Sequence, residues 1–154
     1  MRTLFFTTSS SSVLIILGGY VACCGNTARV LALEDNSWNH VTDMGKSRLS
    51  HACAALGNRV YVLGGYYKQP SEVLIVEESG YTVTDGPNLP ANVERYGKAI
   101  TYDGSVFYID SKGKVIKLKS DDSGWEEIAD NSYDEGKPVN AVVVTYDQLF
   151  DNLA

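Results

Sequence analysis

Residues 59–66 read RVYVLGGY, and residues 13–20 read VLIILGGY. In both stretches a strand-like run of five residues leads into two glycines, and a tyrosine follows the second glycine. The interval from Gly18 to Gly64 is 46 residues. The recurrence of a whole segment at this interval indicates a repeat protein, and the β-branched and aromatic residues indicate that its repeats are built from short strands.

Two further strand-like runs follow in each copy. The third strand is predicted at residues 29–33, 72–76 and 114–118, and the fourth strand opens on an aromatic residue, Trp38, Tyr81 or Trp125. Clusters of Asp, Asn, Ser and Gly separate the two strands and predict tight turns. Each copy is therefore predicted to be a four-stranded antiparallel sheet.

A third copy aligns with the second at a shift of 47 residues. This alignment places Val60-Tyr61-Val62 on Phe107-Tyr108-Ile109 and replaces the glycine pair with Ser111-Lys112, so that Gly113 makes the tight turn. A fourth copy begins at Pro138 and ends with the chain. The predicted repeats span residues 1–47, 48–94, 95–137 and 138–154.

The composition narrows the classes of protein. The chain has 154 residues, and its ten tyrosines and two tryptophans favour strands over helices. A net charge of −6 disfavours nucleic acids and anionic membrane surfaces as partners. The apolar N-terminus could be a signal peptide, but residues 13–17 match the strand before the glycine pair, and we favour the strand. Three cysteines without a spaced framework, and no Asn-x-Ser/Thr site, favour a cytoplasmic protein with reduced thiols over a secreted one.

The repeated residues resemble kelch repeats. That family combines an arginine, a first strand with a small residue, a turn, a hydrophobic second strand, a diglycine, a third strand and a tryptophan. The second copy has Arg48, His51-Ala52, Gly57-Asn58, the second strand, and a third strand that ends at Val76. The resemblance implies an all-β fold of kelch-type β-propeller blades in an incomplete ring. Its structural motif residues are Gly18, Gly19, Trp38, Gly64, Gly65, Tyr81 and Trp125.

Three features depart from the family pattern. Tyr81 stands in place of a tryptophan, the third copy lacks a diglycine, and the first copy has no preceding arginine. An ordinary propeller has four to eight blades, so three copies and a start are too few for a ring. We expect either self-association that closes the ring or blades supplied by a longer protein.

Catalytic and metal-binding patterns are missing from the sequence. It contains no Gly-x-Ser-x-Gly, phosphate loop or His-Glu-x-x-His motif. Cys23 and Cys24 point apart on an extended chain and make a poor metal site. Asp121-Asp122 is predicted to be a solvated turn, and His51 a partly buried polar residue of a first strand. We expect no catalytic residue, cofactor or metal.

A binding face is the remaining candidate. Loops that join strands two and three share one face with the loops that lead to the next blade, and these are predicted at residues 20–28, 66–71, 42–50 and 85–97. Long loops on a rigid scaffold commonly carry recognition. By resemblance to kelch proteins that capture peptides, the candidate contacts are Tyr20, Tyr66, Arg48, Ser50, Arg95 and Tyr96. Alternatively, the arginines hold blades together and the tyrosines cover loop backbone.

The sequence leaves three hypotheses about function. The leading hypothesis is a non-catalytic module that binds a protein or peptide, as the substrate-recognition part of a cullin-type ubiquitin ligase adaptor. This role is implied by resemblance, since many kelch proteins pair these repeats with a BTB domain. The alternatives are a fragment of a kelch-fold enzyme, of the sugar oxidase or sialic-acid mutarotase type, and a truncated product without independent function.

Overall fold

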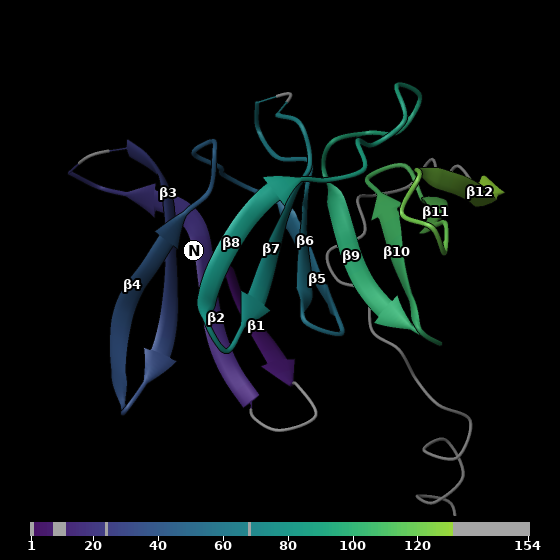
Figure 1. Cartoon of the computed structure of the whole chain (residues 1–154). Coiled ribbons are helices and arrows are strands. Elements are labelled where there is room, and N and C mark those ends of the chain that lie inside the picture. Colours follow the sequence, from purple (N-terminus) through teal and green to yellow (C-terminus); the bar gives the residue numbers. More distant parts are fainter. Residues whose placement is uncertain (1, 8–11, 24, 68, 131–154) are drawn as a thin grey trace, which may run out of the picture.

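Twelve strands in the described part of the chain form three four-stranded antiparallel sheets, which follow one another in chain order (Figure 1). The computed structural model describes residues 2–7, 12–23, 25–67 and 69–130, so the predicted fourth copy at 138–154 lies outside the described residues. Within that described part the sheets do not close into a ring. The structure therefore confirms an all-β fold built from blade-like sheets.

Each sheet is a simple meander of consecutive strands, and the three sheets are called blade 1, blade 2 and blade 3. The strands of blade 1 are β1 (Arg2–Thr7), β2 (Ser12–Val21), β3 (Gly25–Glu34) and β4 (Ser37–Asp43). Those of blade 2 are β5 (Ala52–Leu56), β6 (Arg59–Leu63), β7 (Glu72–Glu77) and β8 (Gly80–Asp85). Those of blade 3 are β9 (Gly97–Tyr102), β10 (Ser105–Asp110), β11 (Lys114–Leu118) and β12 (Trp125–Asp130).

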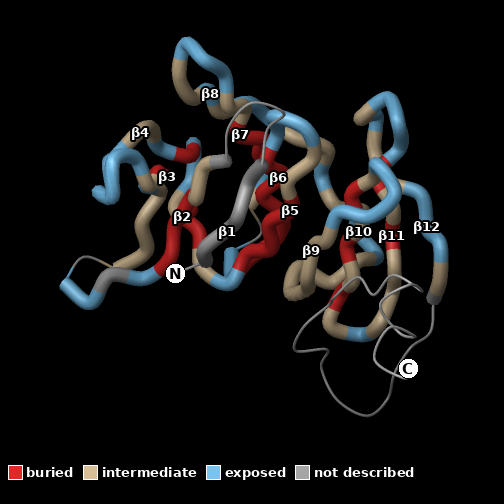
Figure 2. The backbone as a smooth tube through the Cα atoms, turned by 90° about the horizontal axis from the view of Figure 1, so that it is seen from below, coloured by how far each residue is buried: buried red, intermediate tan, exposed pale blue. Residues whose placement is uncertain are grey.

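The hydrophobic core lies between the blades, because blade 2 is apolar on both faces. Side chains of a strand alternate between the two faces of its sheet. In β6, Val60 and Val62 pack against blade 1, whereas Tyr61 and Leu63 pack against blade 3. All four are at most 2% exposed. Figure 2 shows the buried residues concentrated in β2, β5, β6, β7, β10 and β11, with exposed turns at the ends of the strands.

In the structure, the first hairpin of the third copy lies 46 residues after the first hairpin of the second copy. The predicted shift of 47 residues is therefore wrong for this hairpin. Leu56 pairs with Arg59 across one turn, and Tyr102 pairs with Ser105 across the other. The counterpart of Tyr61 is therefore Phe107, whereas the sequence alignment chose Tyr108. A slip of one residue moves a side chain to the opposite face of the sheet.

The glycine position of the third copy must be corrected in the same way. Because Ile109 is the counterpart of Leu63, the pair Asp110-Ser111 takes the place of Gly64-Gly65, and the predicted Ser111-Lys112 is one residue too late. Gly113 does lie in the following turn, with a φ of 90° and its N–H on the Asp110 carbonyl at 3.2 Å.

The two diglycines share one backbone conformation. Both glycines of each pair have positive φ, 53° and 113° at Gly18 and Gly19, and 63° and 116° at Gly64 and Gly65. A Cβ on Gly64 would collide with the carbonyl of Arg95, so only glycine allows the next blade this close. The second glycine of each pair donates its N–H to that neighbouring segment: Gly19 to the Arg48 carbonyl at 2.9 Å, and Gly65 to the Arg95 carbonyl at 3.0 Å.

The aromatic residues of the fourth strands face the preceding blade. The Tyr81 hydroxyl donates to the Glu34 carboxylate of blade 1 at 2.9 Å, and Trp125 Nε1 donates to the Pro87 carbonyl at 3.0 Å. Trp38 is 43% exposed, because no described blade precedes its sheet. Whether self-association covers this face stays a prediction.

The structure overturns one local prediction and adds a contact to another. Residues 20–28 were expected to form a long loop, but Tyr20 pairs with Asn26 and Val21 with Gly25, so β2 and β3 extend to a short turn. Asp121-Asp122 lies on an exposed turn, as expected, and the Asp122 carboxylate also bonds to the guanidinium of Arg59 and to the Tyr61 hydroxyl, which ties blade 3 to blade 2. In the described part of the chain, no helix has the length and apolar character needed to cross a membrane.

Candidate binding cleft

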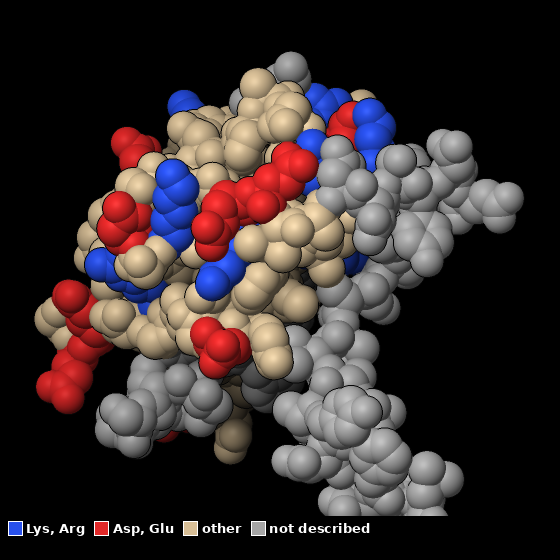
Figure 3. Space-filling view, turned by 90° about the vertical axis from the view of Figure 1, so that its right-hand side faces the viewer, with Lys and Arg blue, Asp and Glu red and all other residues tan. Residues whose placement is uncertain are grey.

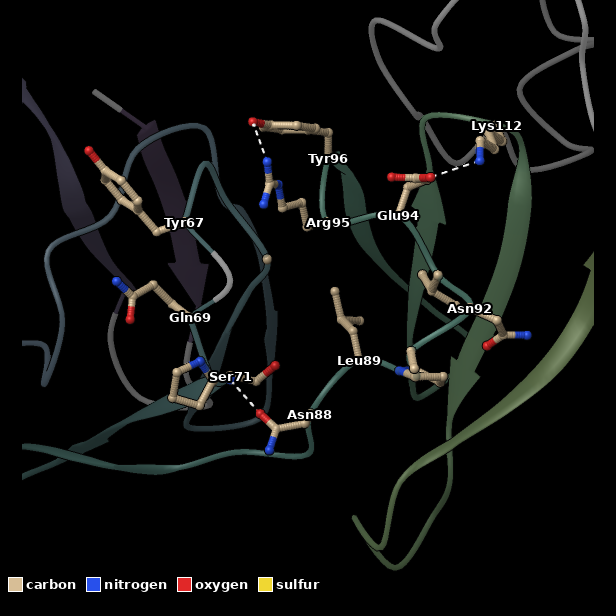
Figure 4. A pocket seen from close by; sticks show the side chains of 15 residues that line it. Tyr67, Gln69, Ser71, Asn88, Leu89, Asn92, Glu94, Arg95, Tyr96 and Lys112 are labelled. Atoms are coloured by element: carbon tan, nitrogen blue, oxygen red, sulfur yellow. Dashed lines mark hydrogen bonds and ion pairs between the residues drawn. The ribbon is translucent and has the colours of Figure 1, made fainter.

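One end of the sheets carries the β2–β3, β4–β5, β6–β7 and β8–β9 connections, as the strand order predicts (Figure 1). The β6–β7 loop and the β8–β9 segment enclose a cleft of about 920 Å³. Its lining consists of residues of these two connections together with Lys112 of the β10–β11 turn, and Figure 4 shows their side chains. Two adjacent blades therefore build one concave site.

Hydrogen bonds fix the β8–β9 segment, which supplies most of the lining. The Tyr108 hydroxyl donates to the Glu94 carbonyl at 2.9 Å, and the Glu94 N–H donates to the Asp110 carboxylate at 3.0 Å. At the other wall, the Asn88 side-chain carbonyl accepts the N–H of Ser71 at 2.8 Å. The cleft is preformed, because its walls are bonded to buried strands and to each other.

The lining combines apolar side chains, among them Leu89, with amide, hydroxyl and charged groups. Leu89 points into the cleft between its two walls (Figure 4), and it also packs against the core between blades 2 and 3. Glu94 and Lys112 form an ion pair at 2.8 Å, with Lys112 70% exposed. The hydrogen bond and the charge of Glu94 raise the pKa of Lys112 above its usual value.

Arg95 and Tyr96, two of the candidate contacts predicted from the sequence, both lie in the lining of the cleft. The Arg95 guanidinium carbon lies 5.1 Å from the centre of the Tyr96 ring, a cation–π arrangement. Its Nη2 is 3.5 Å from the Tyr96 hydroxyl. Arg95 is half-buried and extends from the β8–β9 segment toward the loop that carries Tyr67 (Figure 4).

Arg48 has a different environment from Arg95. Its side chain has 0% exposure and pairs with Glu72 at 2.7 Å. The same guanidinium donates to the Gly64 carbonyl at 3.3 Å and to the Pro70 carbonyl. The prediction that Arg48 contacts a ligand is therefore wrong, because a guanidinium that is buried and fully hydrogen-bonded cannot reach a ligand at the loop face.

The other sequence candidates lie outside the cleft lining. Tyr66 is 52% exposed, and its ring meets the ring of Tyr67 edge-on at 5.1 Å between centres. Tyr20 lies at the exposed β2–β3 hairpin, and Ser50 lies in the exposed β4–β5 connection with a φ of 56°. Their role in binding stays a prediction.

The sequence analysis placed the binding face on loops that include residues 66–71 and 85–97, but it named neither Tyr67, Gln69 and Asn88 within them nor Lys112 outside them. A signal for Asn88 existed, because the stretch from Gly86 to Pro90 contains two prolines and an asparagine, a composition typical of a shaped loop. Lys112 carried no such signal, since it reaches the cleft only through the turn that follows β10.

The described residues contain no group of three His, Cys, Asp or Glu side chains that could hold a metal ion. His40 is half-exposed and bonds to Asp43 at 2.9 Å, three residues along the same strand. His51 is 1% exposed, more buried than the sequence suggested, and lies behind the backbone of Gly65. Neither histidine lies in the lining of the cleft.

Comparison with known proteins gives one informative similarity. No family model matches the chain. A curated protein of Arabidopsis thaliana, named as an F-box/kelch-repeat protein, is 29% identical over 93 residues. The match covers 57% of this chain and 24% of that protein, so the similarity spans about a quarter of the relative's length. The chain thus resembles kelch-repeat proteins in both its sequence and its blade-like sheets.

Proposed function

We propose that this chain is a non-catalytic module that binds a protein or peptide in the cleft between the β6–β7 loop and the β8–β9 segment. One observation carries the proposal: two connections from adjacent blades, fixed by hydrogen bonds to buried strands, enclose about 920 Å³. Concave preformed sites with a few placed polar groups are the usual form of a binding site.

The lining suits a peptide. It offers an apolar side chain for anchoring, aromatic rings in Tyr67 and Tyr96, and amides that can bond a peptide backbone. Tyrosine supplies a large contact area with little loss of conformational entropy, which is why it is frequent at recognition surfaces. The similarity to an F-box/kelch-repeat protein supports the same class of function.

Selection from a phage-displayed library of random peptides tests the proposal. We expect the full chain to enrich peptides that lose binding to a variant with Tyr67→Ala and Tyr96→Ala. The control is Tyr102→Ala, which removes a tyrosine as exposed as Tyr67 (52% against 50%) but outside the cleft lining. No enrichment by the wild-type chain, or undiminished binding by the double variant, would contradict the proposal.

A finer proposal is that the module is the substrate-recognition part of a cullin-type ubiquitin ligase adaptor in the cytoplasm. Its support is the kelch resemblance and the name of the relative, which joins kelch repeats to an F-box. Proximity labelling from the tagged chain in living cells would test it. We expect cullin subunits among the labelled proteins, and their absence would reject the adaptor role while leaving peptide binding untouched.

A further inference from the structure

The segments that lead into blades 2 and 3 follow equivalent backbone paths. Each presents an arginine carbonyl to the second glycine of the preceding diglycine, Arg48 to Gly19 and Arg95 to Gly65. The two arginines therefore occupy one position of the repeat. Their side chains nevertheless lie in different surroundings.

In blade 2 the arginine side chain itself holds the junction together. The Arg48 guanidinium bonds to Gly64, the first glycine of its own blade, and to Pro70 in the loop that follows. It also bonds to Glu72, the first residue of β7. Glu72 in turn accepts the N–H of Gly45 at 2.6 Å. Since Glu72 neutralises it, this guanidinium contributes no free charge to the loop face.

In blade 3 a carboxylate performs the same structural task. Asp110 replaces the first glycine of the pair, is 1% exposed, and accepts three backbone N–H groups. One comes from Glu94 in the segment that leads into the blade, at 3.0 Å. The other two come from Lys112 in the turn before β11, at 2.8 Å, and from Lys114, the first residue of β11, at 3.0 Å. Asp110 thus connects the parts that Arg48 connects in blade 2, and the side chain of Arg95 is not needed for this purpose.

The guanidinium of Arg95, which takes no part in these structural bonds, gives the cleft its net charge. Among the described residues that line it, the charged ones are Glu94, Arg95 and Lys112. Glu94 and Lys112 neutralise each other, and no described carboxylate lies within ion-pair distance of Arg95. One uncompensated positive charge remains, in a chain with a net charge of −6. Figure 3 shows acidic and basic groups interspersed on the visible part of the outer side of blade 3.

We propose that the cleft selects peptides by one acidic side chain, whose carboxylate pairs with the guanidinium of Arg95. The inference rests on the proposed function, since it names the chemistry of the peptide that the same cleft takes. Arginine offers a planar fork that matches a carboxylate in a bidentate pair. The ring of Tyr96 lies against the guanidinium and its hydroxyl is 3.5 Å from Nη2, which leaves the other N–H groups of Arg95 for the ligand. A single excess charge fits a monoanionic carboxylate better than a dianionic phosphate.

Immobilised peptide pools test this selectivity. The pools share randomised flanks and differ at one central position, which is Glu, Gln, phosphoserine or Lys. We expect the full chain to bind the Glu pool at least about tenfold more strongly than the isosteric Gln pool, the range of a charge-assisted hydrogen bond. Arg95→Gln should reduce that ratio to about one. Lys117→Gln, which removes the same charge outside the cleft lining, should leave it unchanged.

The outcomes separate this inference from the proposed function. Equal binding of the Glu and Gln pools, stronger binding of the phosphoserine pool, or a ratio that survives Arg95→Gln would overturn the acidic selectivity alone. Binding of no pool would overturn both the selectivity and the proposed function. Circular dichroism of each variant verifies the fold, and because the readout is a ratio between two pools, partial loss of folded protein does not alter it.

Discussion

The junction into blade 2 and the junction into blade 3 use opposite charges for the same task. At the first, a buried cation, Arg48, donates to backbone carbonyls and to Glu72. At the second, a buried anion, Asp110, accepts backbone N–H groups, and the equivalent arginine lies in the cleft. A repeat position can therefore serve stability in one copy and recognition in the next, provided that another residue takes over the structural bonds.

The largest effect is expected from Glu72→Gln at the first junction. The change leaves the guanidinium of Arg48 buried without its counter-charge, and breaking a buried pair costs about 3 kcal/mol or more. Urea unfolding followed by tryptophan fluorescence measures the loss. Glu126→Gln, which breaks an exposed pair with Lys117, is the matched control and should cost less than about 1 kcal/mol. Equal losses in the two variants would remove Arg48 from its structural role.

A smaller loss is expected from Asp110→Asn at the second junction. The asparagine amide keeps one acceptor oxygen but turns an N–H₂ group toward a backbone N–H, so one buried donor loses its partner at a cost of about 2 kcal/mol. Asp121→Asn is the control, because its carboxylate accepts the N–H of Ser123 on an exposed turn. Urea unfolding should separate the two variants, and an unaffected Asp110→Asn variant would contradict the role assigned to this carboxylate.

A contact between blades 1 and 2, away from both junctions, should have the smallest effect. Burial, the hydrogen bond to Glu34 and the charge of that carboxylate raise the pKa of Tyr81 from 10.0 to about 12. The unfolded chain therefore loses this proton first, so the stabilising contribution is complete below pH 10 and declines as the pH rises toward 12.

Tyr81→Phe should flatten that part of the pH dependence and cost less than about 1 kcal/mol at neutral pH. The measurement is the free energy of unfolding in urea from about pH 9 to about pH 11. Tyr102→Phe, at an exposed tyrosine of blade 3, is the control. A wild-type profile that runs parallel to that of Tyr81→Phe would show that this hydroxyl does not stabilise the contact between the blades.

The sequence predicted the repeated elements well because each is local. Strand runs, turn residues and the glycine pairs lie within a few residues of one another, and the structure has four strands where each full copy was predicted. The register of the third copy failed because Gly57 was aligned with Gly104. In the structure Gly57 is the first residue of its turn and Gly104 the second, so the glycines are not equivalent.

The site was predicted only in part because its chemistry depends on distant partners. Arg95 and Tyr96 were among the candidates, and they line the cleft. The sequence could not separate Arg48 from Arg95, because the residue that neutralises Arg48 is Glu72, 24 positions further along the chain. The replacement of a glycine by Asp110 looked like a degraded repeat, whereas the buried carboxylate stabilises the junction.

The central claim is that Arg48 serves the fold and Arg95 does not, and paired methionine substitutions test it most directly. We predict that Arg48→Met lowers the free energy of unfolding by about 3 kcal/mol or more, because Glu72 is left buried and unpaired. Arg95→Met should lower it by about 1 kcal/mol or less, since only the contacts of the guanidinium with the ring and the hydroxyl of Tyr96 are lost. Equal losses for the two variants in urea unfolding would contradict the division of roles between the two arginines.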